Sequence, residues 1–130
     1  AYRRIFENNS VEWIKLLALG LQKAVFDKET GLAYATISQA DLKETGAAMS
    51  ETENLVDRLR SVAGINAAMI LKETRQGDIK VSLRSQEPVD VGRLAREFGG
   101  GGHKHASGFT AKDRPENIIQ NVKKWLTESS

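Results

Sequence analysis

The sequence predicts an α/β fold in which helices pack on one mixed β-sheet of about five strands. Segments whose apolar residues recur at helical spacing alternate with short apolar or alternating segments along the 130 residues. Glycines and polar turn residues separate these segments. The length makes one domain the expected organisation, and 40% apolar with 28% charged residues is the composition of a globular rather than a disordered protein.

A first helix is expected from about residue 11 to Phe26, after the N-cap candidates of the Asn8–Ser10 segment. Gly20 lies in its middle and weakens it without ending it. The polar segment 27–31 then reads as a turn. The residues that recur at helical spacing are Val11, Ile14, Leu17 (or Leu16), Leu21 and Val25.

Two strands and two helices are expected over residues 32–71. The first strand covers 32–38, and a short helix follows in which Ser38 and Asp41 resemble a capping box and Gly46 is the stop. A second capping box, Ser50 with Glu53, predicts a helix that ends before residue 64. Residues 65–71 are nearly all apolar, which is typical of a strand covered on both faces.

The strand expected over residues 79–85 alternates cleanly between apolar and polar side chains. Because successive side chains of a strand point to opposite faces, three polar and partly cationic side chains share one face of a strand that otherwise forms core. The apolar set is Ile79, Val81 and Leu83, and the polar set is Lys80, Ser82 and Arg84.

The remaining elements are two helices and a short strand. Pro88 breaks the chain, Asp90 is a helix cap, and Gly99 ends the helix that follows. A short strand is expected over residues 109–111, and a last helix is expected to start near Pro115.

The charge is uneven along the chain although the net charge is only +2. Residues 75–112 hold seven Lys or Arg against four Asp or Glu, together with both histidines. Such a local excess attracts phosphate groups, although a solvated surface explains it equally well. The chain has no cysteine, which excludes disulfides and thiolate metal sites.

The glycine run Gly99–Gly102 is the most informative segment. Four successive glycines can let backbone N–H groups converge on an anion, and this interpretation is favoured over a flexible linker. The run fits neither GxxxxGK[ST] nor GxGxxG, because His103, Lys104 and His105 occupy positions that those motifs reserve for other residues, and the run follows a helix rather than a strand.

Neither metal binding nor catalysis is favoured by the residues themselves. His103 and His105 could share an ion, but Lys104 lies between them and Asp113 is the nearest acid downstream. No nucleophile with a recognisable context is present. The chemistry of the sequence therefore favours binding over catalysis.

Four segments together resemble the DHHA1 domain, the C-terminal substrate-binding part of DHH-family phosphoesterases, and above all the bacterial group of oligoribonucleases and phosphoadenosine-phosphate phosphatases. Ser107 departs from the alanine that the family shows more often. The four segments are residues 80–85, 89–91, 98–103 and 106–109.

The resemblance implies a division of labour. Residues 1–30 would be a linker and N-terminal helix, and residues 31–130 a DHHA1-like domain that grips the substrate. An N-terminal DHH domain, absent from this chain, would hold two manganese ions, so no cofactor is expected here and the isolated chain is expected to be inactive. The implied substrate-binding residues are Ser82, Arg84, Ser85, Gly100, Gly101, Gly102 and His103.

The implied function is nucleotide and nucleic-acid binding within a cytoplasmic phosphoesterase. The expected partners are short RNA or DNA oligonucleotides or nucleotide phosphates, the DHH domain of the same protein, and no membrane. Two alternatives stay open: an RNA-binding appendage like the DHHA1 region of alanyl-tRNA synthetases, and a structural domain that forms homodimers.

Overall fold

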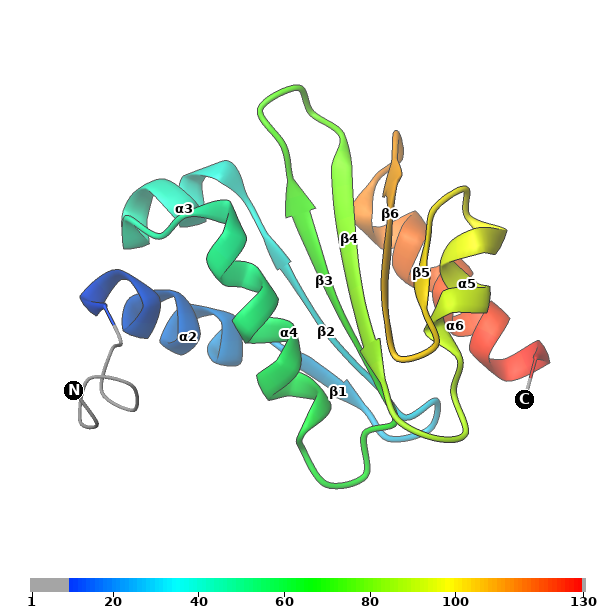
Figure 1. The fold of residues 1–130 in the computed structure, drawn as a ribbon. Helices are drawn as coiled ribbons and strands as arrows, with labels where there is room; N and C mark the ends of the chain where they lie inside the picture. Colours follow the sequence, from blue (N-terminus) through cyan, green and yellow to red (C-terminus); the bar gives the residue numbers. More distant parts are fainter. Residues whose placement is uncertain (1–9, 130) are drawn as a thin grey trace.

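The computed structural model describes residues 10–129, and within them six strands form one mixed sheet (Figure 1). The α/β class is confirmed, with six strands where about five were expected. Strands β2 and β3 run parallel, and every other neighbouring pair is antiparallel. In the order β1-β2-β3-β4-β6-β5 across the sheet, the bounds are β1 Val25–Asp27, β2 Leu32–Ile37, β3 Ala67–Glu73, β4 Ile79–Ser85, β6 Ala106–Ala111 and β5 Gly101–His103.

Helices cover both faces of this sheet (Figure 1). One face carries α2 (Val11–Lys23), α3 (Gln39–Thr45) and α4 (Thr52–Arg60), with the 3₁₀ turn η1 (Met49–Glu51) leading into α4. The other carries α5 (Val91–Glu97) and α6 (Pro115–Glu128). The expected linker segment Tyr2–Arg4 lies outside the described residues.

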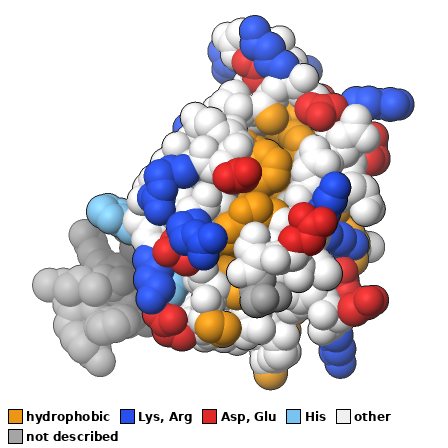
Figure 2. Space-filling model, turned by 90° about the vertical axis from the view of Figure 1, so that its right-hand side faces the viewer, with side chains coloured by type: hydrophobic (Ala, Val, Ile, Leu, Met, Phe, Trp, Pro, Cys, Tyr) orange, Lys and Arg blue, Asp and Glu red, His pale blue; other side chains and the backbone are white. Residues whose placement is uncertain are grey.

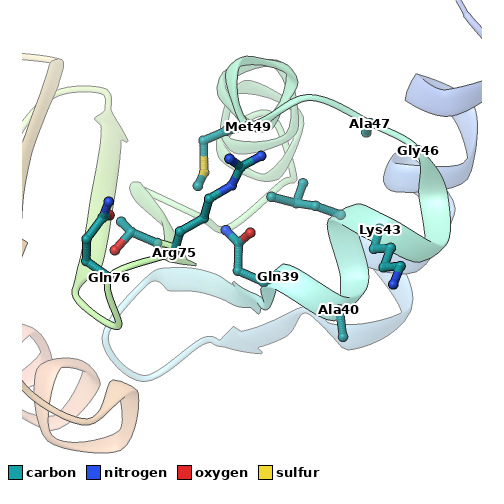
Figure 3. A pocket seen from close by; sticks show the side chains of 10 residues that line it. Gln39, Ala40, Lys43, Gly46, Ala47, Met49, Arg75 and Gln76 are labelled. Carbon is teal, nitrogen blue, oxygen red and sulfur yellow. The ribbon is translucent and has the colours of Figure 1, made fainter.

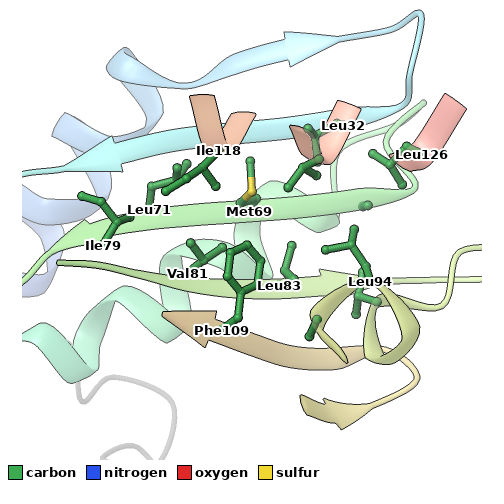
Figure 4. Close-up of a cluster of buried hydrophobic side chains, with 14 residues drawn as sticks. Leu32, Met69, Leu71, Ile79, Val81, Leu83, Leu94, Phe109, Ile118 and Leu126 are labelled. Carbon is green, nitrogen blue, oxygen red and sulfur yellow. The ribbon is translucent and has the colours of Figure 1, made fainter. Parts of the chain in front are cut away.

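Two apolar cores result, one on each face. Strand β3 contributes to both, because Met69 and Leu71 face α5 and α6 whereas Ala68 and Ile70 face α4. Figure 4 shows the larger core, which Leu83, Leu94, Phe109 and Ile118 join from other elements. The expectation of a central strand covered on both faces is confirmed.

The outer surface of the α5/α6 layer shows apolar side chains in a strip flanked by charged ones (Figure 2). Arg93 partly covers this layer, since its guanidinium carbon lies 5.7 Å from the centre of the Trp125 ring. Within residues 10–129, no helix has the length and apolar character that crossing a bilayer requires.

Helix α2 differs from the expectation in length and in orientation. It ends at Lys23 because Ala24 is extended, and Val25–Asp27 then pair with β2 as strand β1. The buried face holds Gly20, where a Cβ would come within 2.5 Å of Leu55 on α4. The close approach to α4 at Gly20 thus lies on the face that packs. That face carries Trp13, Leu16 and Gly20, while Val11, Ile14, Leu21 and Val25 of the periodic set are exposed.

The start of α4 also differs. The predicted capping box of Ser50 and Glu53 is wrong, because Glu51 instead accepts the backbone N–H of Ala48 at 3.2 Å in the preceding turn. The Glu53 side chain turns toward the sheet, where it meets a buried lysine.

Candidate functional site

A cavity of about 820 Å³ lies between the start of α4, strands β4 and β6, and the turn after α5. Its floor is polar because Lys80 and Ser82 of β4 point to the α4 face, while the apolar residues of the same strand point into the core of the other face. Strand β6 continues the floor with Gly108 opposite Ser82 and Thr110 opposite Lys80. The cavity lining consists of Met49, Ser50, Glu53, Lys72, Lys80, Val81, Ser82, Gly99, Gly100, Ser107, Gly108, Phe109 and Thr110.

A buried polar cluster forms the wall nearest to α4. Lys72 is 2% exposed, and its ammonium donates to the Glu53 carboxylate at 2.9 Å and to the Ser82 hydroxyl at 2.6 Å. The Ser82 hydroxyl donates in turn to the same Glu53 oxygen at 2.6 Å. These three side chains come from α4, β3 and β4 and fix one another, so the wall is formed before any ligand arrives.

The electrostatics of the cluster lower the pKa values of both Glu53 and Lys72. Desolvation raises the pKa of Glu53, but hydrogen bonds from Ser82, Lys72 and Arg84 and the charge of Lys72 outweigh it, so the pKa falls from 4.5 to about 2. Desolvation lowers the pKa of Lys72, and the charges of Lys80 and Arg84 add to this while Glu53 opposes it. A further anion at this wall would therefore relieve an excess of positive charge.

Acid should destabilise the fold through Glu53. Because the folded pKa of about 2 lies below the ordinary 4.5, the carboxylate stabilises the protein above pH about 4.5, and this contribution disappears as the pH falls toward 2. Urea unfolding of the parent and of Glu53→Gln at several pH values measures it. The difference in unfolding free energy should be largest at pH 7 and should shrink below pH about 4.5. A difference that stays constant down to pH 2 would contradict this prediction.

Arg84 lies beside the cluster with its donors already engaged. Its Nη2 donates to Glu53 at 3.0 Å, its Nε to Asp57 at 3.1 Å, and its Nη1 to the Leu83 carbonyl at 2.9 Å. A phosphate that bound Arg84 would compete with two carboxylates. Arg84 remains a predicted site residue, and it lies outside the cavity lining, two positions after Ser82 on β4.

Lys80 is the cation that the cavity offers to a ligand. It is exposed, lines the cavity, and forms no ion pair within the part of the chain that the structure describes. The alternation of the strand predicted Lys80 on the same face as Ser82, but Lys80 was not among the predicted site residues. Its position two residues before Ser82 is the signal that identifies it. Lys72 was also missed, because an apolar strand surrounds it in the sequence.

The second half of the glycine run is built into the sheet, and the first half forms the turn after α5. Gly101–His103 form strand β5, which pairs with β6. The N–H of Gly100 donates to the Ala95 carbonyl at 2.8 Å, so this amide already has a partner. Gly99 and Gly100 line the cavity, whereas Gly101, Gly102 and His103 are exposed beyond its lining.

Ser85 lies apart from the cavity lining. Its buried hydroxyl donates to the Val89 carbonyl at 2.7 Å and lies 3.3 Å from the Lys104 carbonyl, so it ties the end of β4 to the two loops beside it. These two contacts give the Ser85 hydroxyl a structural role that involves no ligand. Of the seven predicted site residues, Ser82 and Gly100 line the cavity.

The described residues do not fit a metal ion. Within residues 10–129, no three His, Asp or Glu side chains come together in a group that could hold one. The manganese implied by the resemblance would therefore need ligands from outside residues 10–129.

Comparisons with known proteins agree on one family. The family model described as DHHA1 domain matches residues 29–128. A Bacillus subtilis relative, the bifunctional oligoribonuclease and PAP phosphatase NrnA, is 39% identical over 102 residues, which are 77% of this chain and 32% of that protein. The chain thus spans about a third of the length of this curated relative.

Two solved structures have similar folds. An exopolyphosphatase-related protein from Bacteroides fragilis has a TM-score of 0.85 at 25% identity, over 97% of this chain and 38% of that one. The C-Ala domain of alanyl-tRNA synthetase from Aquifex aeolicus has a TM-score of 0.56 at 20% identity, over 73% of this chain and 89% of that one. The second likeness concerns the fold alone.

Proposed function

Because this chain belongs to the DHHA1 domain family, we propose that it is the substrate-holding domain of a phosphoesterase that acts on short oligonucleotides or on phosphoadenosine phosphate. The relative that is named an oligoribonuclease and PAP phosphatase supports this substrate class. The hydrolytic chemistry, with its manganese, belongs in this proposal to a separate DHH domain. In this proposal the described residues bind and orient the substrate.

The observation that carries the proposal is the cavity floored by Lys80 and Ser82. Its volume of about 820 Å³ lies within the roughly 300–1,000 Å³ of small-molecule sites. A phosphate placed there would accept hydrogen bonds from the Lys80 ammonium and face the positive charge of Lys72. Thr110 and Ser50 add hydroxyl groups to the lining. The site therefore suits one nucleotide end rather than an extended surface.

Binding of a dinucleotide to this chain tests the proposal. Calorimetric titration with 5′-phosphorylated pApA should show saturable binding, and Lys80→Gln should weaken it about tenfold because a charge-assisted contact to phosphate is lost. Lys124→Gln is the matched control, since it removes the same charge from an exposed position on α6, which covers the opposite face. Equal affinities of the parent and Lys80→Gln would contradict the assignment of Lys80.

Arg84→Ala and His103→Ala test the remaining predicted contacts in the same titration. A loss of affinity with an unchanged unfolding midpoint would assign the residue to binding. Arg84 also bridges Glu53 and Asp57, so its variant needs the stability measurement beside it. The tRNA-binding alternative predicts instead that intact tRNA binds far better than pApA and with a steep dependence on salt.

A further inference from the structure

A second cavity of about 810 Å³ lies between α3, η1 and the turn that joins β3 to β4 (Figure 3). Met49 lines both this cavity and the first one. Lys72 of β3 lines the first cavity, and Thr74, just beyond the end of β3, lines the second. The two cavities therefore adjoin at Met49, near the end of β3. The lining residues that carry charge or polar groups are Gln39, Lys43, Thr74, Arg75 and Gln76.

The second cavity has a positive and otherwise neutral lining. Arg75 and Lys43 contribute cations, no Asp or Glu belongs to the lining, and neither cation forms an ion pair within residues 10–129. Both side chains are exposed. Figure 3 shows the Arg75 side chain extending from the turn toward Met49, which is the residue that the two cavities share.

The wall of the second cavity is fixed in place. The Gln39 side chain donates to the Glu73 carbonyl at 2.7 Å, and the Glu73 carboxylate accepts the backbone N–H of Gln39 at 3.0 Å. These two contacts hold the start of α3 against the end of β3. Glu73 is the acid in this network, and its carboxylate accepts that N–H and forms no ion pair with Arg75 within residues 10–129.

We propose that this second cavity is a subsite for a backbone phosphate of an oligonucleotide whose end occupies the first cavity, with Arg75 as its donor. The proposal rests on the proposed function and adds to it a preference for substrates longer than two nucleotides. Because no aromatic residue lines the second cavity, it would recognise the phosphate and not the base. Arg75 suits this role because its guanidinium offers two donors to one phosphate.

Chain-length dependence of binding tests the proposal. The parent is titrated with pApA and with the pentanucleotide pApApApApA, next to Arg75→Gln and the control Lys124→Gln. The parent and the control should bind the pentanucleotide about tenfold more tightly than pApA. Arg75→Gln should abolish this gain while its affinity for pApA stays within about twofold of the parent value. In Arg75→Gln, the slope of the logarithm of the pentanucleotide binding constant against the logarithm of the salt concentration should also decrease by about 0.7. This is the value for one lost phosphate contact to a single strand.

Each other outcome has a distinct meaning. A pentanucleotide that binds the parent no better than pApA overturns the second subsite and leaves the proposed function standing. A gain that survives in Arg75→Gln has the same consequence. If the parent binds neither RNA saturably, the proposed function itself is contradicted. A uridine pentanucleotide that binds the parent as tightly as pApApApApA supports recognition of the phosphate. If the tenfold gain is lost with uridine, recognition of the phosphate alone is overturned.

Discussion

Gly100→Ala is expected to destabilise the protein by about 3 kcal/mol, the upper end of the cost of forcing extra volume into a packed site. The added methyl group would overlap the carbonyl oxygen of Gly108 and lie 2.5 Å from the Cβ of Phe109. Both neighbours belong to β6, which β4 holds on its other side. Backbone cannot yield as a flexible side chain does, so the turn after α5 would have to move away from the sheet.

Gly101→Ala is the matched control, since its Cβ would meet nothing within 4 Å and its backbone is not left-handed. Its unfolding free energy should stay within about 0.5–1 kcal/mol of the parent value. Urea unfolding at pH 7 measures both variants. Similar midpoints for the two would show that the close approach of Gly100 to β6 is absent in solution.

Glu53→Ala is expected to cost about 2–3 kcal/mol, because it leaves the ammonium of Lys72 buried with Ser82 as its remaining hydrogen-bond partner. Lys72→Met should cost less, since the Glu53 side chain is 41% exposed and keeps Arg84 as a partner. The double variant Glu53→Ala, Lys72→Met should be more stable than the sum of the single changes predicts. Replacing both members of a buried ion pair by apolar residues often changes stability little, whereas removing one member is strongly destabilising.

Urea unfolding of the parent, the two single variants and the double variant at pH 7 gives the coupling energy directly. A coupling of at least about 1 kcal/mol is expected for groups in one hydrogen-bonded cluster. Simple additivity would mean that water, rather than Glu53, solvates the Lys72 ammonium.

Local rules identified much of the fold from the sequence. Ser38 with Asp41 forms the expected capping box, Asp90 accepts the N–H of Arg93, and α6 begins at Pro115. These features depend on residues within one turn of each other, which is why sequence reasoning finds them. The resemblance to the DHHA1 domain is confirmed by the family match.

The features that sequence reasoning missed depend on tertiary contacts. Helix α2 has apolar residues on two sides, and the buried side is the one on which Gly20 allows close approach to Leu55. Glu53 has the spacing of a capping-box residue relative to Ser50, yet its carboxylate instead accepts a hydrogen bond from the buried Lys72 ammonium. Strand β5 is three residues with two glycines, so its sequence carries no strand signal, and pairing with β6 creates it.

For the candidate site, the alternation of β4 was sufficient to place Ser82 and Arg84 on one face with Lys80. The sequence could not show that Arg84 is neutralised by α4, or that Ser85 serves the loops beside β4. The first fact requires knowing which helix covers the strand, and the second requires knowing which loops lie beside its end. The second cavity was equally hidden, because its residues come from two segments about 30 positions apart.

The sheet ends on both sides in strands of three residues, β1 and β5. Short edge strands expose few unpaired backbone groups, and proteins use them to avoid joining edge to edge with other chains. An additional strand at either edge would find only the three residues of β1 or of β5 as its template. The long strands β3 and β4 are thereby kept in the interior, where their backbones are already paired. The domain should therefore resist fibril formation at concentrations that the proposed titrations require.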